Sequence, residues 1–184
     1  MFRWIVRRRL AAFEREFGYD ATYLRDILDA SALAMWRFYP IGALSNYRQG
    51  IPSVPWHAAR ITATLSEDCG PCTQLVVTMA ERDGISPATI RAILAGEVTD
   101  MGPDAALGYR FAIAVIERDI SEADRLRAEI LTRWSKQALV SLTLTIAASR
   151  VYPIVKYGLG HGRACTRIRV AGAEQPVAAR ATHV

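Results

Sequence analysis

The chain has 184 residues, of which 51% are hydrophobic, and carries a net charge of +5. This length favours one domain with a sizeable core over two independent domains. Three cysteines, an odd number, disfavour a secreted disulfide framework and favour a reducing compartment, so we expect a cytoplasmic protein. The arginines are scattered among acidic residues, a pattern that predicts no nucleic-acid partner.

Residues 2–17 predict an amphipathic helix with a basic face. Arg7, Arg8 and Arg9 interrupt an apolar pattern that ends at Gly18. Such a helix can attach to a membrane surface or an acidic partner, or it can pack on the body of the protein or on a neighbouring subunit. We favour packing. The short apolar start lacks the cleavage pattern of a secretory signal.

Apolar residues at helical spacing predict about seven to eight helices along the chain. After the first helix, we expect helices over 20–39, 56–65, 69–84, 86–96, 103–118 and 121–134, and a last long helix that Ser135 opens. No segment shows the sustained alternation of a β-strand. We therefore predict an all-α fold, with a single domain over 1–160 and an extended C-terminal tail over 161–184.

The last long helix contains the longest apolar run of the chain, Ala138 to Val155. Arg150 and Pro153 interrupt this run, which indicates a buried helix rather than a membrane span. Its apolar surface covers most of the circumference, which is typical of a bundle centre or a subunit interface. We therefore expect a homo-oligomer.

Cys69 and Cys72 are separated by two residues at the start of a predicted helix. Ser66 or Asp68 can cap this helix, and Pro71 suits its first turn. The positive end of the helix dipole favours a thiolate there, whereas the carboxylates of Glu67 and Asp68 disfavour one or shuttle its proton. The first sulfur of such a pair normally meets the substrate, but the spacing does not fix which one does. The alternative is a buried, inert pair.

Residues 55–96 resemble the core of the AhpD-like, carboxymuconolactone decarboxylase superfamily. The resemblance lies in a helix that leads to Cys69-Gly-Pro-Cys72, the apolar remainder of the cysteine helix, Gly84 and the capped segment that begins at Ile85-Ser86-Pro87. The superfamily implies an AhpD-like helical bundle, oligomeric, whose redox-active members are alkylhydroperoxidases. Its decarboxylase branch lacks the cysteine pair.

The resemblance also implies where a proton relay to the thiols lies. The peroxidases of the family have a glutamate twelve residues before the first cysteine and a histidine four after the second, positions that hold His57 and Val76 here. His57 or Glu67 is the substitute base that we expect, and Glu81 is a weaker candidate. A lone histidine at a helix start is as often a solvated or hydrogen-bonding group.

These observations predict a thiol-dependent peroxidase that reduces organic hydroperoxides and needs neither a bound cofactor nor a metal. By the resemblance, the reductant is a dithiol such as a lipoyl group on a carrier protein. Two alternatives stay open: a general dithiol–disulfide oxidoreductase, and a non-enzymatic helical oligomer that senses oxidation or is stabilised by the pair. A less favoured reading joins the pair with His161 and Cys165 in a zinc site.

Overall fold

The computed structural model describes residues 1–164 and 167–177, and this part of the chain is mostly helical. The predicted all-α character is confirmed, with the addition of one small sheet. The described residues form the elements α1 (Phe2–Phe17), α2 (Thr22–Ala30), α3 (Ala32–Phe38), α4 (Ile41–Ser45), α5 (Ser53–Leu65), α6 (Gly70–Arg82), α7 (Pro87–Ala95), η1 (Val98–Asp100), α8 (Pro103–Glu117), α9 (Ile120–Arg133), α10 (Lys136–Gly158), β1 (Arg167–Val170) and β2 (Ala173–Pro176).

The helix predicted over 20–39 is wrong as a single helix: this segment divides into α2 and α3, and the short helix α4 follows where none was predicted. Ser31 adopts an extended backbone and its hydroxyl accepts a hydrogen bond from the Ala34 amide, so α2 ends and α3 begins at this residue. Pro40 then opens α4. The helix predicted from Ser121 begins at Ile120 instead, because Asp119 is its cap.

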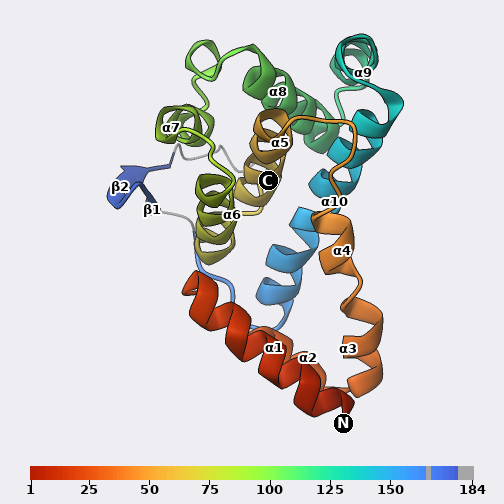
Figure 1. The fold of residues 1–184 in the computed structure, drawn as a ribbon, viewed down its shortest axis with the longest axis vertical. Helices are drawn as coiled ribbons and strands as arrows, with labels where there is room; N and C mark the ends of the chain where they lie inside the picture. Colours follow the sequence, from red (N-terminus) through yellow and green to blue (C-terminus); the bar gives the residue numbers. More distant parts are fainter. Residues whose placement is uncertain (165–166, 178–184) are drawn as a thin grey trace.

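Helix α5 is the centre of the molecule, and every residue from Pro55 to Thr64 is buried. One face of α5 packs with α6, α7 and β1 in a first hydrophobic core, and another face packs with α8, α9 and α10 in a second. Figure 1 shows α5 between α6 and α7 on one side and α8 and α10 on the other, with α8 and α9 at the upper end of the molecule. The burial on both sides explains why this helix carries little charge.

The first three helices lie at the lower end of the molecule in Figure 1, and α10 runs from the upper part towards them. Their apolar residues form a third core that is separate from the other two, around Leu10, Tyr23, Leu28 and Met35. This core also receives Leu75 of α6 and Tyr152 of α10. Helix α1 therefore packs on other helices of the same chain, chiefly α2 and α3, with Val6 and Leu10 buried.

Two antiparallel strands occupy part of the predicted tail, a feature that the residue pattern did not indicate. In β1, Ile168 and Val170 are buried in the first core against α6 and α7. Gln74 of α6 binds both the carbonyl and the amide of Arg169, and Glu81 accepts a hydrogen bond from the Ala171 amide. The hairpin is thus fixed along one side of the cysteine helix.

Candidate functional site

Cys69 and Cys72 form a disulfide at the start of α6, with their Cα atoms 5.3 Å apart. Cys69 occupies the N-cap position, so the predicted caps Ser66 and Asp68 are wrong. The Gly70 amide instead donates a hydrogen bond of 3.0 Å to the carbonyl of Arg163, beyond α10. The predicted start of a helix at the cysteines is confirmed, with Pro71 in its first turn.

The two sulfur-bearing residues have different surroundings. Cys69 is fully buried under the segment that follows α10, whereas Cys72 lines a cavity of about 510 Å³. This volume falls within the range of small-molecule sites, roughly 300–1,000 Å³. Cys72 is therefore the residue of the pair that a ligand in the cavity reaches, although the first cysteine is the usual expectation for such a motif.

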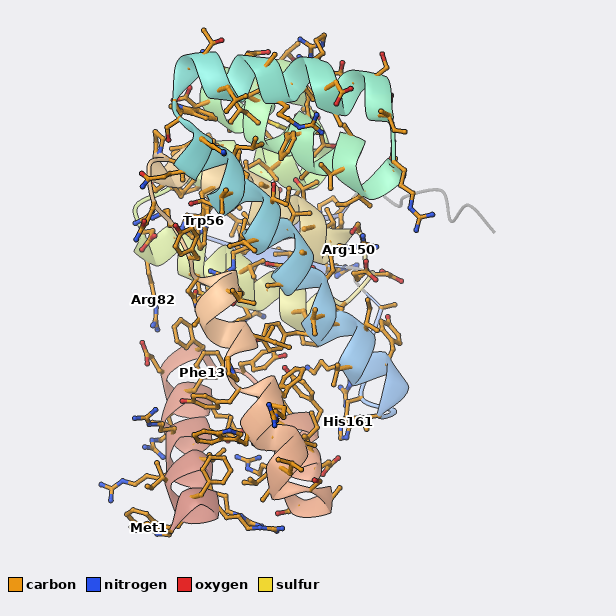
Figure 2. The ribbon with its side chains drawn as sticks, turned by 90° about the vertical axis from the view of Figure 1, so that its right-hand side faces the viewer. Met1, Phe13, Trp56, Arg82, Arg150 and His161 are labelled. Atoms are coloured by element: carbon orange, nitrogen blue, oxygen red, sulfur yellow. A yellow bond between two sulfur atoms is a disulfide. The ribbon has the colours of Figure 1, made fainter. Side chains whose placement is uncertain are left out.

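The cavity lies between the N-terminal helices and the body formed by α5, α6 and α10. Its apolar lining includes Phe13, Met35, Phe38, Leu75, Val76 and Met79. In Figure 2, Phe13 lies in the part of α1 nearest the rest of the molecule. Arg9 and Tyr39, which are exposed and joined by a hydrogen bond of 2.9 Å, mark the mouth of the cavity.

A group of buried tyrosines surrounds the Cys72 end of this cavity. The hydroxyl of Tyr19 lies 3.8 Å from Cys72 Sγ and 3.5 Å from the hydroxyl of Tyr23. Burial raises the pKa of Tyr19 to about 12 and raises the pKa of Tyr23 as well, so both phenols keep their protons at neutral pH. The sequence pattern gave no sign of Tyr19, which comes from the loop between α1 and α2.

Lys156 of α10 lies beside the tyrosine pair. Its Nζ is 4.4 Å from the centre of the Tyr19 ring and 5.1 Å from that of Tyr23, which is the geometry of a cation–π contact. Burial lowers the pKa of Lys156. A positive charge thus lies against the ring whose hydroxyl faces the cysteine sulfur.

His57 does not lie beside the cysteines. It is buried at the other end of α6, where its Nε2 is 2.9 Å from Asp83 Oδ2. Asp83 follows Cys72 by eleven residues, which corresponds to roughly 16 Å along a helix. Burial lowers the pKa of His57. Val76, at the position of the family histidine, lines the cavity with an apolar side chain.

The predicted glutamates are engaged elsewhere. Glu67 accepts a hydrogen bond from Arg150 of α10 in a half-buried ion pair, so it is near Cys69 in the chain but absent from the cavity wall. Glu81 holds the hairpin through the Ala171 amide. Of the four predicted site residues, the structure therefore brings together the two cysteines and leaves His57 apart from them.

Two further polar residues on the cavity wall were missed by the sequence reasoning. Arg60 of α5 and Ser149 of α10 are both buried, and both line the cavity. The one local signal was that Arg60 is the single arginine or lysine between Ser53 and Leu65. Ser149 carries no such signal.

The zinc reading is not supported by the described residues. Among them, no group of three or more histidine, cysteine or acidic residues is arranged to hold a metal ion. His161 pairs with Asp26 at 2.6 Å, and Cys165 lies outside the described residues. The expectation of a site without metal stays a prediction.

Helix α10 is long and apolar enough to cross a membrane by length and composition, and within the described chain it alone meets this test. A core helix of a soluble protein meets the same test. Residues such as Leu142, Ile146 and Lys156 are buried against the rest of the chain. The interpretation of α10 as a buried helix rather than a membrane span stays a prediction.

Comparisons of the chain with protein-family models, with curated proteins and with solved structures found no match. The class that the structure establishes is therefore a mostly helical protein with a Cys-x-x-Cys disulfide at a helix start. Membership of the AhpD-like superfamily and the oligomeric state stay predictions.

Proposed function

We propose that this protein is a thiol-dependent peroxidase that reduces organic hydroperoxides through Cys69 and Cys72. The observation that carries the proposal is the position of Cys72 on the wall of a largely apolar cavity, with the Tyr19 hydroxyl 3.8 Å from its sulfur. The cavity suits the organic part of a hydroperoxide, and the hydroxyl suits the oxygen that leaves.

The proposed cycle starts from the reduced protein. The Cys72 thiolate attacks the terminal oxygen of the hydroperoxide, so that an S–O bond forms while the O–O bond breaks, and the alkoxide takes a proton and leaves as an alcohol. The Cys69 thiolate then attacks the sulfenic sulfur of Cys72. An S–S bond forms and hydroxide leaves as water once it is protonated. The disulfide seen here is the product of this step.

An external dithiol must return two electrons to this disulfide. It opens the S–S bond by thiol–disulfide exchange and is itself oxidised to a disulfide. Cys69 is fully buried and Cys72 is 3% exposed, which favours a slender reductant over a broad protein surface. A lipoyl group on a flexible arm of a carrier protein meets this requirement.

Tyr19 is the proposed proton donor to the alkoxide. Its raised pKa keeps the phenol protonated, and the neighbouring positive charge of Lys156 favours an anion at this place. Of the two predicted bases for the cysteine proton, His57 lies at the far end of α6, so Glu67, two residues before Cys69 in the chain, is the one left to test.

The test is the reaction of the reduced protein with cumene hydroperoxide. Stopped flow measures its rate, and mass spectrometry of the cysteine peptide identifies the product. Cys72→Ser should abolish the reaction, whereas Cys69→Ser should stop it at a sulfenic acid on Cys72. Tyr19→Phe should slow the first step by at least about 100-fold, the lower end of what one proton donor contributes. Glu67→Gln tests the base.

Tyr47→Phe is the matched control, because the Tyr47 hydroxyl binds Gln49 at the surface and Tyr47 is not among the residues that line the cavity. It should react like the unaltered protein. A wild-type rate no faster than that of a free thiol would overturn the proposal. Rapid exchange with dithiols would then indicate a general oxidoreductase, and an inert pair a sensor or a structural element.

A further inference from the structure

The cavity contains a buried cation that has no anionic partner among the described residues. Arg60 is 6% exposed, and within the described chain it has neither an ion pair nor a side-chain hydrogen bond. Its guanidinium stacks on Trp56 at 5.0 Å, and its Nε atom is buried without a hydrogen-bond acceptor. Burying a charge without an acceptor is costly, so such a group indicates a ligand that supplies one.

A second unpaired polar group lies on the same wall. The hydroxyl of Ser149 on α10 is buried and also has no hydrogen-bond partner among the described residues. Arg60 and Ser149 come from different helices that pack together, so their convergence on one cavity is a feature of the fold. Each of the two groups can donate a hydrogen bond to an anion in the cavity.

The charge of the cavity is one-sided. Arg9 at the mouth and Arg60 inside are its charged lining residues, and no acidic residue is among the described residues that line it. The carboxylate of Asp83 acts on the Arg60 charge but is not paired with it, since Asp83 pairs with His57 and Arg48. Burial lowers the pKa of Arg60 to about 10, so the guanidinium stays charged at neutral pH.

Most of the remaining lining is apolar and includes Phe13, Leu24, Met35 and Leu75, while Ser45, Asn46, Thr64 and the tyrosines add uncharged polar groups. A small inorganic anion would leave this surface unfilled. A molecule with one anionic head and an aliphatic or aromatic body would match both parts of the cavity. A carboxylate matches the planar, bidentate donor geometry of a guanidinium.

We propose that this cavity binds an amphipathic carboxylate, such as a medium-chain fatty acid, with its head on Arg60 and Ser149 and its chain along the apolar lining. Because Cys72 lies on the same wall, the hydroperoxides that the protein reduces carry such a carboxylate. This second statement rests on the proposed function, whereas the binding of the carboxylate does not.

The first test is calorimetric titration of the oxidised protein with octanoate and with octan-1-ol, which share a chain and differ in the head. Octanoate should bind at least about tenfold more tightly, as expected for hydrogen bonds to a charged group. Arg60→Met should remove this difference. Ser149→Ala should lower the affinity for octanoate severalfold and leave the affinity for octan-1-ol unchanged.

Arg48→Met is the matched control. Arg48 also lies over the Trp56 ring, at 5.7 Å, but it is exposed and is not among the residues that line the cavity. Its replacement should preserve the preference for octanoate. Thermal unfolding of each variant shows whether it is folded, and the comparison of the two ligands on the unaltered protein needs no variant.

Equal affinity for octanoate and octanol would overturn the proposal, as would a failure of octanoate to bind at millimolar concentration. These measurements involve no turnover, so they stand apart from the test of the peroxidase. If the peroxidase is established, kcat/KM for a carboxylate-bearing hydroperoxide should fall in Arg60→Met by about tenfold, while that for cumene hydroperoxide should not.

Discussion

Cys72 and Tyr19 show how a site is assembled from residues of different origin. Cys72 is placed by its own helix, whose first turn follows directly from the local sequence. Tyr19 comes from a loop 53 residues earlier in the chain, and its hydroxyl faces the sulfur because its ring is packed with Phe13 and Lys156. The cysteine pair is thus a local feature, and its chemical environment is a tertiary one.

At the scale of single residues, His57 predicts how stability depends on pH. The ring is 1% exposed, its Nδ1 is buried without a partner, and burial lowers its pKa. Below the ordinary pKa of about 6.5 the unfolded chain takes up a proton that the folded chain does not. Stability is therefore complete above this pH and falls as the pH is lowered through it.

Urea unfolding between pH 7.5 and pH 5.5 measures this dependence. The free energy of unfolding should decrease towards acid in the unaltered protein, and His57→Gln should flatten the decrease. Asp83→Asn is the control. The Asp83 carboxylate accepts a hydrogen bond from His57 and raises the pKa of His57, so its removal leaves the effect of burial and the decrease should persist. An identical slope in the unaltered protein and in His57→Gln would contradict the assignment.

The residues that the sequence identified are those with a local signal. The Cys-x-x-Cys spacing, Pro71 and the apolar positions that follow suffice to place both cysteines at a helix start. Arg60 and Ser149 were missed because the missing partner of a polar group is a property of packing, which a single sequence does not contain. His57 was predicted because it lies twelve residues before Cys69 in the sequence. In the folded chain its side chain contacts Asp83 instead of the cysteines.

At the scale of elements, α5 and α8 approach each other closely. Gly108 of α8 touches the backbone of Pro55, and a Cβ atom built there would lie 2.1 Å from the Pro55 carbonyl oxygen. Backbone cannot yield as a flexible side chain can, so these two helices must separate to accept any larger residue. This contact positions the helix that carries Arg60.

Gly108→Ala should therefore destabilise the protein. Overpacking costs about 1–3 kcal/mol, which exceeds the gain of about 1 kcal/mol in helix propensity. Gly158→Ala is the control, because Gly158 is also helical and has no heavy atom within 4 Å of the added Cβ. The midpoint of urea unfolding should fall for the first variant and hold or rise for the second. Equal stability of the two variants would mean that α5 and α8 can move apart without loss of stability.

Helix boundaries were predictable where a cap is encoded locally. Two helices begin at the serines expected as their caps. The hydroxyl of Ser86 accepts a hydrogen bond from the Thr89 amide, and that of Ser135 accepts one from the Ala138 amide. The division of the segment after Asp20 was not predictable, because its apolar spacing continues through Ser31. The hairpin was missed because each strand has four residues, too few for a visible alternation.

At the scale of the whole molecule, the cavity separates two unequal parts. Helix α5 lies between the first and second cores, whereas the third core belongs mainly to α1–α3 and meets the body through a few residues of α6 and α10. The cavity occupies much of this boundary. The N-terminal helices therefore have fewer packing partners than α5 or α8.

Hydrogen exchange of the native protein should reveal this difference. Amides of α2 and α3 should exchange faster than those of α5 and α8, because the weaker part opens without global unfolding. Saturation with octanoate should slow exchange in α2 and α3 more than in α8, since the ligand is proposed to bridge the two parts. Uniform protection across all these helices would show that the molecule opens as a single unit.

The loose attachment of the N-terminal helices to the rest of the molecule has a consequence for evolution and engineering. Trp4 and Trp36 are each 62% exposed, on helices that form one side of the cavity. Substitutions that tie these helices more firmly to the body would raise thermal stability and, at the same time, slow the entry and release of the ligand. Selection for rapid ligand exchange would therefore keep this end of the molecule the least stable, and variants selected for heat resistance should exchange the proposed ligand more slowly.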